Sequence, residues 1–318
     1  MTPRAVLLVL APLVGCVARA PASRHDVPVV VFYDENGNGA LDADEVVRLP
    51  GVRVELAGRV TTTVAGGRAV LTNMPAGRHS ITVDTGSLPP FCAAGPPLAV
   101  EVGAGVEAAV PVTLPIGDNV PNTYMAFGDS ITRGVGYSDD QSYRGQLESR
   151  LGAHFGRARV VDQGSPHGRS NQGAQRIATS LAAVRPAYTL VLYGTNDWNF
   201  PPCKQVDGCF TIRSLRRILD AVKQARSLPV LATIPPANQG FDHRSPPERN
   251  EWVAGINEEV RALAREEGAL LVDLHAAFMA RPSLRPLFTD HVHPSASGFE
   301  LIADSFFAAL TAARSPTR

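Results

Sequence analysis

From residue 122 onward, short apolar runs alternate with longer stretches whose apolar residues recur at helical spacing. The runs are residues 124–127, 160–162, 189–193, 230–233 and 270–272, and the helical stretches are residues 141–155, 172–184, 212–225 and 247–267. In the last stretch, Trp252, Ile256 and Val260 recur at every fourth position and share one helix face. Repeated units of this kind predict a parallel sheet with helices on both faces. We expect a three-layer α/β/α fold with a flavodoxin-like sheet.

Ligands of such sheets bind where the strands end, and polar blocks stand at these places. They are Gly128-Asp129-Ser130-Ile131-Thr132, Gln163-Gly164-Ser165, Gly194-Thr195-Asn196-Asp197 and, after a further helix, Asp290-His291-Val292-His293-Pro294. Taken together and in this order, the four blocks resemble those of the SGNH (GDSL) hydrolase family. The resemblance covers about residues 122–313 and implies an esterase or lipase that uses no catalytic cofactor.

The residue types in these blocks suit ester hydrolysis. A serine hydroxyl is a weak nucleophile until a neighbouring base takes its proton, and Ser130 stands between a strand and a helical turn. His293 can act as that base because histidine titrates near neutral pH. Asp290 precedes it by three residues, so one turn can bring its carboxylate to the imidazole. We expect Ser130, His293 and Asp290 to form a catalytic triad.

The resemblance also implies an oxyanion hole, built from the N–H of Ser130, the N–H of Gly164 and the side-chain amide of Asn196. Here the chain has Asp162 where the family usually has asparagine, and we expect little effect because the matched donor is the glycine. His291 is a rival base, but the family spacing selects His293. Asp129 and Asp197 are interpreted as residues that hydrogen-bond loops and helix caps.

Aromatic residues near these blocks have open roles. Trp198 and Phe200 either wall an acyl pocket or anchor a loop. Tyr137 and Tyr143 are candidates for the opposite wall.

The N-terminus reads as a targeting segment. Residues 1–15 hold Arg4 and an apolar run too short to span a membrane. Leu13-Val14-Gly15-Cys16 resembles the lipobox of bacterial lipoproteins, which implies cleavage before Cys16 and lipidation of its thiol. We expect an exported protein, anchored to a membrane through Cys16 and a tether over residues 16–26, that faces the periplasm or the cell exterior. A plain secretory signal with a chance cysteine is the alternative.

Export favours disulfides, because oxidising compartments preserve them. Cys203 and Cys209 are close in sequence within a loop that contains proline and glycine, so we expect them to pair. Cys92 is the odd cysteine, which we interpret as a buried thiol.

Residues 27–115 show the period-two alternation of strands, as in Val52, Val54 and Leu56, with turn signals at strand-length intervals. About seven strands predict a small all-β sandwich. One loop in it matches the spacing of calcium-binding loops. The region resembles the B-type repeats of bacterial surface adhesins (SdrD B-like), and a structural Ca²⁺ would be bound through Asp34, Asn36, Asn38, Ala40, Asp42 and Glu45.

Charge excludes one class of partner. Lysine and arginine total 30, as do aspartate and glutamate. The chain therefore lacks the net positive charge that would favour binding to nucleic acid. The sequence predicts a serine esterase whose substrate is a small-molecule, lipid or acetylated-glycan ester. The alternatives are a metal-dependent phosphoesterase, whose ligands would include Asp129, Asn196 and Asp197, and an adhesion or scaffold lipoprotein with an inactive hydrolase domain.

Overall fold

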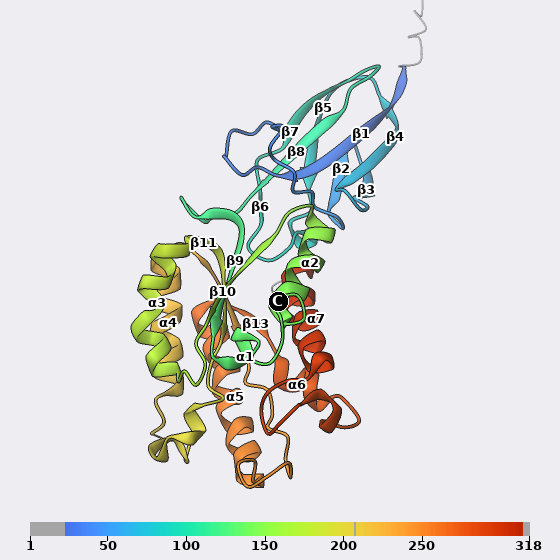
Figure 1. The fold of residues 1–318 in the computed structure, drawn as a ribbon. Coiled ribbons are helices and arrows are strands. Elements are labelled where there is room, and N and C mark those ends of the chain that lie inside the picture. Colours follow the sequence, from blue (N-terminus) through green and yellow to red (C-terminus); the bar gives the residue numbers. More distant parts are fainter. Residues whose placement is uncertain (1–22, 207, 314–318) are drawn as a thin grey trace, which may run out of the picture.

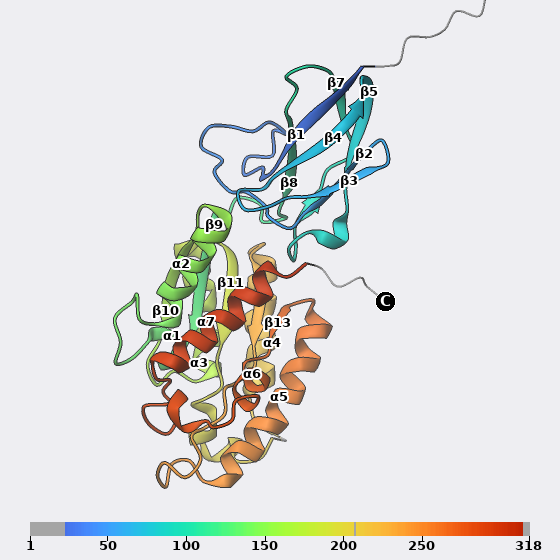
Figure 2. The ribbon, with the colours of Figure 1, turned by 90° about the vertical axis from the view of Figure 1, so that its right-hand side faces the viewer.

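A computed structural model describes residues 23–206 and 208–313 (Figure 1). The predicted signal peptide and lipidation site, Cys16, lie outside the described residues. The described chain forms a sheet-rich region near its start and an α/β region after it, and Figure 2 shows the same arrangement from the side.

The first region is a sandwich of two four-stranded sheets, with strand orders β4-β1-β8-β6 and β3-β2-β5-β7. Alternate residues of facing strands, such as Val29 and Val54, are fully buried between the sheets, which explains the period-two pattern. We expected about seven strands, and the structure has eight in this region; β6 is too short for alternation to reveal it. The strands are β1 (Arg24–Tyr33), β2 (Arg53–Leu56), β3 (Arg59–Thr62), β4 (Arg68–Pro75), β5 (Gly77–Val83), β6 (Ala93–Ala94), β7 (Leu98–Val102) and β8 (Ala108–Thr113), with a turn of 3-10 helix, η1 (Thr85–Ser87), after β5.

The second region contains a five-stranded, fully parallel sheet with strand order β10-β9-β11-β12-β13. Numbered from the start of this region, the order is 2-1-3-4-5, which confirms the flavodoxin-like topology. The strands are β9 (Val120–Gly128), β10 (Arg159–Gly164), β11 (Pro186–Leu192), β12 (Leu228–Ala232) and β13 (Leu270–Val272).

Helices cover both faces of this sheet, as expected (Figures 1 and 2). One face carries α3 (Ser170–Val184), α4 (Thr211–Gln224) and α5 (Pro247–Glu267), which pack against Met125 and Phe127 of β9. The other carries α2 (Tyr143–Phe155), α6 (Leu274–Met279) and α7 (Ala296–Thr311), which pack against Tyr124 and Ala126. None of the helices in the described residues is long and apolar enough to cross a membrane.

The ends of α5 show how the sequence sets these elements. Pro247 takes the first turn, where no intrahelical N–H partner is lost, and Gly268 ends the helix at a φ of 64°. The predicted range 247–267 coincides with the helix observed.

The sandwich packs against the amino-terminal edge of the parallel sheet. Asn122, near the start of β9, donates from Nδ2 to Oε1 of Glu35 at 2.7 Å, and the N–H of Arg48 donates to the carbonyl of Phe155 at 2.9 Å. Ser130 follows the opposite end of β9. The loop predicted to bind calcium therefore lies at the far edge of the sheet from the polar blocks.

Candidate active site

Ser130 is the first residue of the short helix α1 (Ser130–Arg133), which follows β9 after a tight turn. Asp129 begins this helix, accepting the N–H of Ile131 on its side chain at 2.9 Å. A Cβ on Gly128 would lie 2.0 Å from Oγ1 of Thr132 and 2.4 Å from the carbonyl oxygen of Leu192, so only glycine fits there. The turn aims the serine side chain out of the carboxyl edge of the sheet.

The structure brings Ser130, His293 and Asp290 into one hydrogen-bonded chain. Oγ of Ser130 lies 2.9 Å from Nε2 of His293, whose Nδ1 lies 2.7 Å from Oδ2 of Asp290. The other oxygen of Asp290 accepts the backbone N–H groups of Val292 and His293 at 2.8 and 2.7 Å. His293 and Asp290 both lie in the loop between η4 (Arg285–Leu287) and α7. This loop brings His293 to a serine that lies 163 residues earlier in the chain.

The hydrogen bonds keep Asp290 ionised. Burial raises the pKa of Asp290, but the bonds from the His293 side chain and from two backbone N–H groups outweigh burial, so the pKa lies below its usual range. His291 is no substitute for His293. Its Nδ1 lies 3.6 Å from Asp290 and is buried without a hydrogen-bond partner in the described part of the chain.

The three predicted oxyanion donors differ in the hydrogen-bond acceptors that they have in this structure. The N–H of Ser130 is at the first position of α1, where a helix N–H has no intrahelical acceptor. Nδ2 of Asn196 donates to the carbonyl of Gly168 at 3.1 Å. The N–H of Gly164 donates to Oδ1 of Asp162 at 2.8 Å. The carboxylate of Asp162 thus accepts the N–H that the resemblance assigns to the oxyanion hole, a contact that the sequence analysis did not anticipate.

Two arginines offset the charge of Asp162. Nη1 of Arg133 pairs with its Oδ2, and Nε of Arg144 lies 3.7 Å from its Oδ1. Arg144 is buried and also donates to the carbonyl of Thr132 at 2.8 Å, which ties α2 to α1. The sequence analysis missed this cluster, because the three residues lie on three separate elements.

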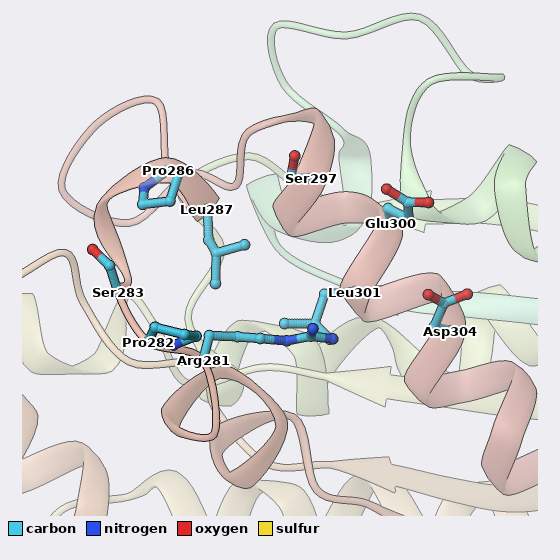
Figure 3. Close-up of a pocket in the computed structure, with 9 residues that line it drawn as sticks. All are labelled: Arg281, Pro282, Ser283, Pro286, Leu287, Ser297, Glu300, Leu301 and Asp304. Atoms are coloured by element: carbon cyan, nitrogen blue, oxygen red, sulfur yellow. The ribbon is translucent and has the colours of Figure 1, made fainter.

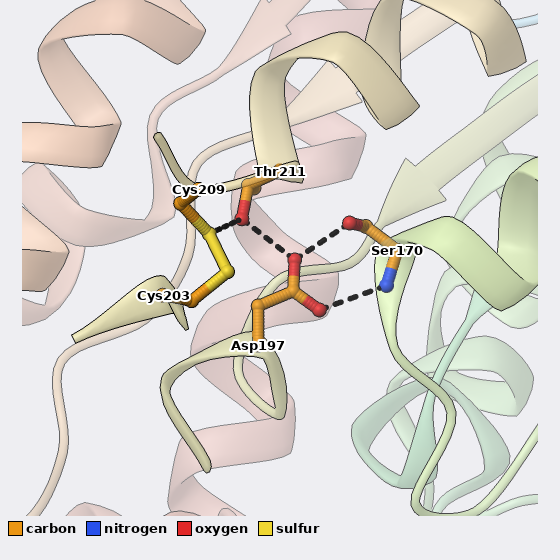
Figure 4. The surroundings of a disulfide bond; sticks show 5 residues. All are labelled: Ser170, Asp197, Cys203, Cys209 and Thr211. Carbon is orange, nitrogen blue, oxygen red and sulfur yellow. Dashed lines mark hydrogen bonds between the residues drawn. A yellow bond between two sulfur atoms is a disulfide. The ribbon is translucent and has the colours of Figure 1, made fainter. Parts of the chain in front are cut away.

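Asp197 holds two of the loops together (Figure 4). It is fully buried and accepts the N–H of Ser170 at 2.9 Å, the hydroxyl of Ser170 at 2.6 Å and the hydroxyl of Thr211 at 2.7 Å. The structure contains the predicted Cys203–Cys209 disulfide, and the sulfur of Cys209 lies 3.1 Å from the Thr211 hydroxyl. The interpretation of Asp197 as a loop-bonding residue holds, and Ser170 and Thr211 are partners that the sequence analysis missed.

Arg176 is a further residue that only the structure reveals. From α3 it reaches the carbonyl oxygens of Gly128, at 3.1 Å, and Gln163, at 2.5 Å, and its guanidinium lies over the ring of Phe127, 4.1 Å from the centroid. It joins the ends of β9 and β10. The only signal in the sequence was an arginine next to Ile177 within a predicted amphipathic helix. The structure shows that Ile177 faces the core.

Two aromatic residues that were candidates for the wall of a substrate pocket, Tyr143 and Trp198, are buried in the core. Tyr143 is fully buried and stacks on Phe306 with 5.5 Å between ring centroids, so its expected place beside the substrate was wrong. Trp198 is buried against Trp252, which favours the interpretation that its side chain anchors a loop. As the side chains are placed within residues 23–206 and 208–313, no three His, Cys, Asp or Glu residues are grouped closely enough to hold a metal ion.

Comparison with known proteins places the sequence of the α/β region in a family. The sequence profile described as the GDSL-like Lipase/Acylhydrolase family matches residues 126–301. The chain belongs to this family. As a GDSL hydrolase it is similar in fold to solved structures, whereas no curated protein sequence matches it significantly.

Three of these structures illustrate the likeness. Axe2, an acetylxylan esterase from Geobacillus stearothermophilus, is 23% identical with a TM-score of 0.51, over 60% of this chain and 95% of that one. LAE5, an alpha/beta hydrolase from the metagenome of Lake Arreo, is 24% identical with a TM-score of 0.49, over 62% and 98%. A lipase/acylhydrolase from Enterococcus faecalis is 21% identical with a TM-score of 0.49, over 62% and 99%. At these identities the likeness concerns the fold alone.

The protonation of Asp129 gives a testable prediction. Burial raises the pKa of Asp129 to about 7; the N–H of Ile131 opposes this rise and the charge of Asp197 adds to it. Because an unfolded aspartate titrates near pH ~3.9, the native chain binds the extra proton between about pH 4 and 7, and this group's contribution to stability falls as pH rises through that window. Asp129→Asn should therefore raise the melting temperature, relative to the wild type, more at pH ~8 than at pH ~5.

Thermal unfolding at the two pH values measures this difference. The exposed Asp118 offers a matched control, since Asp118→Asn should shift both melting temperatures alike. An equal shift at both pH values for Asp129→Asn would contradict a raised pKa.

The disulfide gives a second prediction. Cys203 and Cys209 are six residues apart, and closing such a short loop stabilises the fold by about 2 kcal/mol through the entropy of the unfolded chain. The double variant Cys203→Ser/Cys209→Ser should lower the free energy of unfolding in urea by this amount. A reducing agent should destabilise the wild type and leave the double variant unchanged; an equal effect on both would point to another cause.

Proposed function

We propose that this chain hydrolyses carboxylic esters through a triad of Ser130, His293 and Asp290. The observation that carries the proposal is the continuous hydrogen-bonded chain of 2.9 Å and 2.7 Å that runs from Ser130 Oγ through the His293 ring to Asp290. Geometry of this kind, with a nucleophile, a base and a group that orients the base, recurs on unrelated hydrolase folds.

The reaction follows from these contacts. His293 Nε2 takes the hydroxyl proton of Ser130 while Oγ forms a bond to the ester carbonyl carbon. Collapse of the tetrahedral intermediate breaks the bond to the alcohol oxygen, and His293 returns the proton to the leaving alcohol. A water molecule then attacks the acyl-serine in the same manner, releasing the acid and restoring Ser130. Asp290, ionised and bonded to Nδ1, stabilises the imidazolium that forms at each step.

The oxyanion of each intermediate needs preorganised donors. We assign the N–H of Ser130 and the side-chain amide of Asn196 to this role. The N–H of Gly164 is the third donor of our assignment, and it joins the other two once Asp162 releases it. Loss of one such donor typically lowers kcat by ~10²–10³-fold.

Hydrolysis of p-nitrophenyl esters, from acetate to palmitate, tests the proposal. Ser130→Ala should lower kcat by a factor on the order of 10⁴–10⁶, because no nucleophile remains, while Ser297→Ala, at an exposed serine of α7, should have no effect. An organophosphate should inactivate the wild type and EDTA should not. Activity retained by Ser130→Ala would overturn the triad. Phosphodiester hydrolysis blocked by EDTA would favour the metal-dependent phosphoesterase, and inactivity on every ester and phosphodiester would favour the scaffold lipoprotein.

We also propose that the mature chain is anchored outside the cytoplasm through a lipid on Cys16. The support is the signal-like segment of residues 1–15, whose last three residues form the lipobox-like Leu13–Cys16 together with Cys16. More than one acyl chain gives stable anchoring, whereas a single chain holds a protein only marginally. Such an anchor would present the catalytic region to esters of the envelope or of the surrounding medium.

Finally, we propose that residues 34–45 bind a structural Ca²⁺. Asp34 and Glu45 are 4% and 2% exposed, and neither they nor Asp42 has an ion-pair partner in the described part of the chain. In this structure their carboxylates accept backbone N–H groups, among them those of Gly37 and Gly39 for Asp34, so an ion would rearrange the loop. Carbonyl and carboxylate oxygens are the ligands that Ca²⁺ prefers.

Calcium titration followed by thermal unfolding checks this proposal. At ~100 times the dissociation constant, bound Ca²⁺ stabilises the native state by about 2.7 kcal/mol, so the melting temperature should rise. Asp34→Asn should remove most of the rise, and Asp84→Asn, in a turn elsewhere in the sandwich, should preserve it. A melting temperature independent of Ca²⁺ would contradict the proposal.

A further inference from the structure

The segment of residues 238–245 lies between β12 and α5. Its first residue is hydrogen-bonded to the loop of residues 288–295, which carries Asp290 and His293 and is called the catalytic loop here. The N–H of Asn238 donates to the carbonyl of His291 at 2.9 Å, and its side-chain Nδ2 donates to the carbonyl of Asp290 at 3.2 Å. The same residue is buried, so these bonds form away from water and hold the segment against the backbone that carries the triad.

The end of the segment is bonded to the block that carries Asn196. Arg249 at the start of α5 is only 2% exposed and donates from Nη1 to the carbonyl of Arg244 and from Nη2 to the carbonyl of Thr195, both at 2.9 Å. No carboxylate of the described residues pairs with it in a salt bridge. Its donors thus connect the segment to the residue before Asn196, and the segment lies between two parts of the catalytic site.

A cavity of about 420 Å³ opens beside this segment. It lies next to the catalytic loop, since Phe288 in its wall precedes Asp290 by two residues. Phe241, at the tip of the segment, is 49% exposed, and the turn at Gly240, with a φ of 77°, places it there. The lining consists of Asn238, Gln239, Gly240, Phe241, Arg285 and Phe288.

The lining combines two phenyl rings with unused polar groups. The Arg285 guanidinium makes no salt bridge, and the Gln239 side chain makes no hydrogen bond, with any residue in the described ranges. Arg285 and Gln239 are both exposed, so an acyl chain in this cavity would leave their donors bonded to water alone and gain nothing from them. A ligand with hydroxyls at its rim and apolar faces on its ring would satisfy both kinds of wall.

We propose that this cavity binds the leaving-group sugar of an acetylated glycan. A pyranose ring lies against Phe241, and its hydroxyls bond to the guanidinium of Arg285 and to the amide of Gln239. The acetyl carbonyl then reaches Ser130 from the side of the loop that carries His293. The inference rests on the proposed esterase activity and adds its substrate class: Phe241 and Arg285 determine specificity for the sugar.

Two substrates that share an acetyl group separate sugar binding from chemistry. kcat/KM is measured for acetylated xylo-oligosaccharides and for p-nitrophenyl acetate, and their ratio is compared between variants. Phe241→Ala and Arg285→Gln should each lower the ratio about tenfold, mainly through KM for the glycan. A tenfold change equals about 1.4 kcal/mol, within the range of one lost contact.

Matched controls are at hand. Arg281 lies four residues before Arg285 but lines a separate cavity of about 540 Å³, together with Glu300 and Asp304 of α7 (Figure 3). Arg281→Gln should leave the ratio unchanged, as should Met279→Ala at a residue that is 55% exposed. In Ser130→Ala, binding of deacetylated xylo-oligosaccharides, measured by calorimetry, should persist and weaken on adding Phe241→Ala.

The outcomes distinguish this inference from the proposed function. Serine-dependent hydrolysis of p-nitrophenyl acetate with a ratio that neither variant changes would overturn the sugar subsite alone. A selective loss of long-chain ester hydrolysis in Phe241→Ala would overturn it in favour of an acyl groove. Absence of serine-dependent hydrolysis of either substrate would overturn the esterase, and the inference with it.

Discussion

The backbone hydrogen bonds between β9 and its neighbours β10 and β11 put Gly128 beside both Gly164 and Leu192. Because the three strands are parallel, the chain leaves each of them at the same edge of the sheet. The loop that carries Ser130, the loop that carries Gly164 and Ser165, and the loop that carries Asn196 therefore begin side by side. His293 reaches Ser130 from the loop before α7. Changes to strand order or direction would scatter these groups even if every local motif stayed intact.

Buried polar side chains then hold the irregular loops in place. Asp197 joins the starts of α3 and α4 to its own turn, Arg176 joins the ends of β9 and β10, and Arg249 joins the segment 238–245 to Thr195. Loops leave backbone groups without ladder partners, and such groups must be satisfied when they are buried. Side chains that reach across from helices do this here. The site is consequently supported by Asp197 within a family block and by Arg176 and Arg249 outside the blocks, while the sandwich packs at the opposite edge of the sheet.

Local signals in the sequence predicted the elements well. The range of α5 coincided with its prediction, and the five strands of the parallel sheet followed the five apolar runs. The pairing of Asp290 with His293 was also a local matter, since three residues separate them. Tyr143 shows the limit: an aromatic residue close to Ser130 in sequence gave no sign of whether it faced substrate or core. Its helix packs on α7, more than 140 residues away, and Phe306 buries it.

By itself, the sequence determined the periodicities, the turns and the residue types at strand ends, because these depend on neighbours within a few positions. The tertiary structure decided which of two histidines meets Ser130, that Asp162 takes the N–H of Gly164, and that a loop with Phe241 stands beside the catalytic loop. Each of these depends on packing between segments far apart along the chain. The spacing of residues along the chain does not predict which distant segments come into contact. The packing of the helices on the sheet determines those contacts.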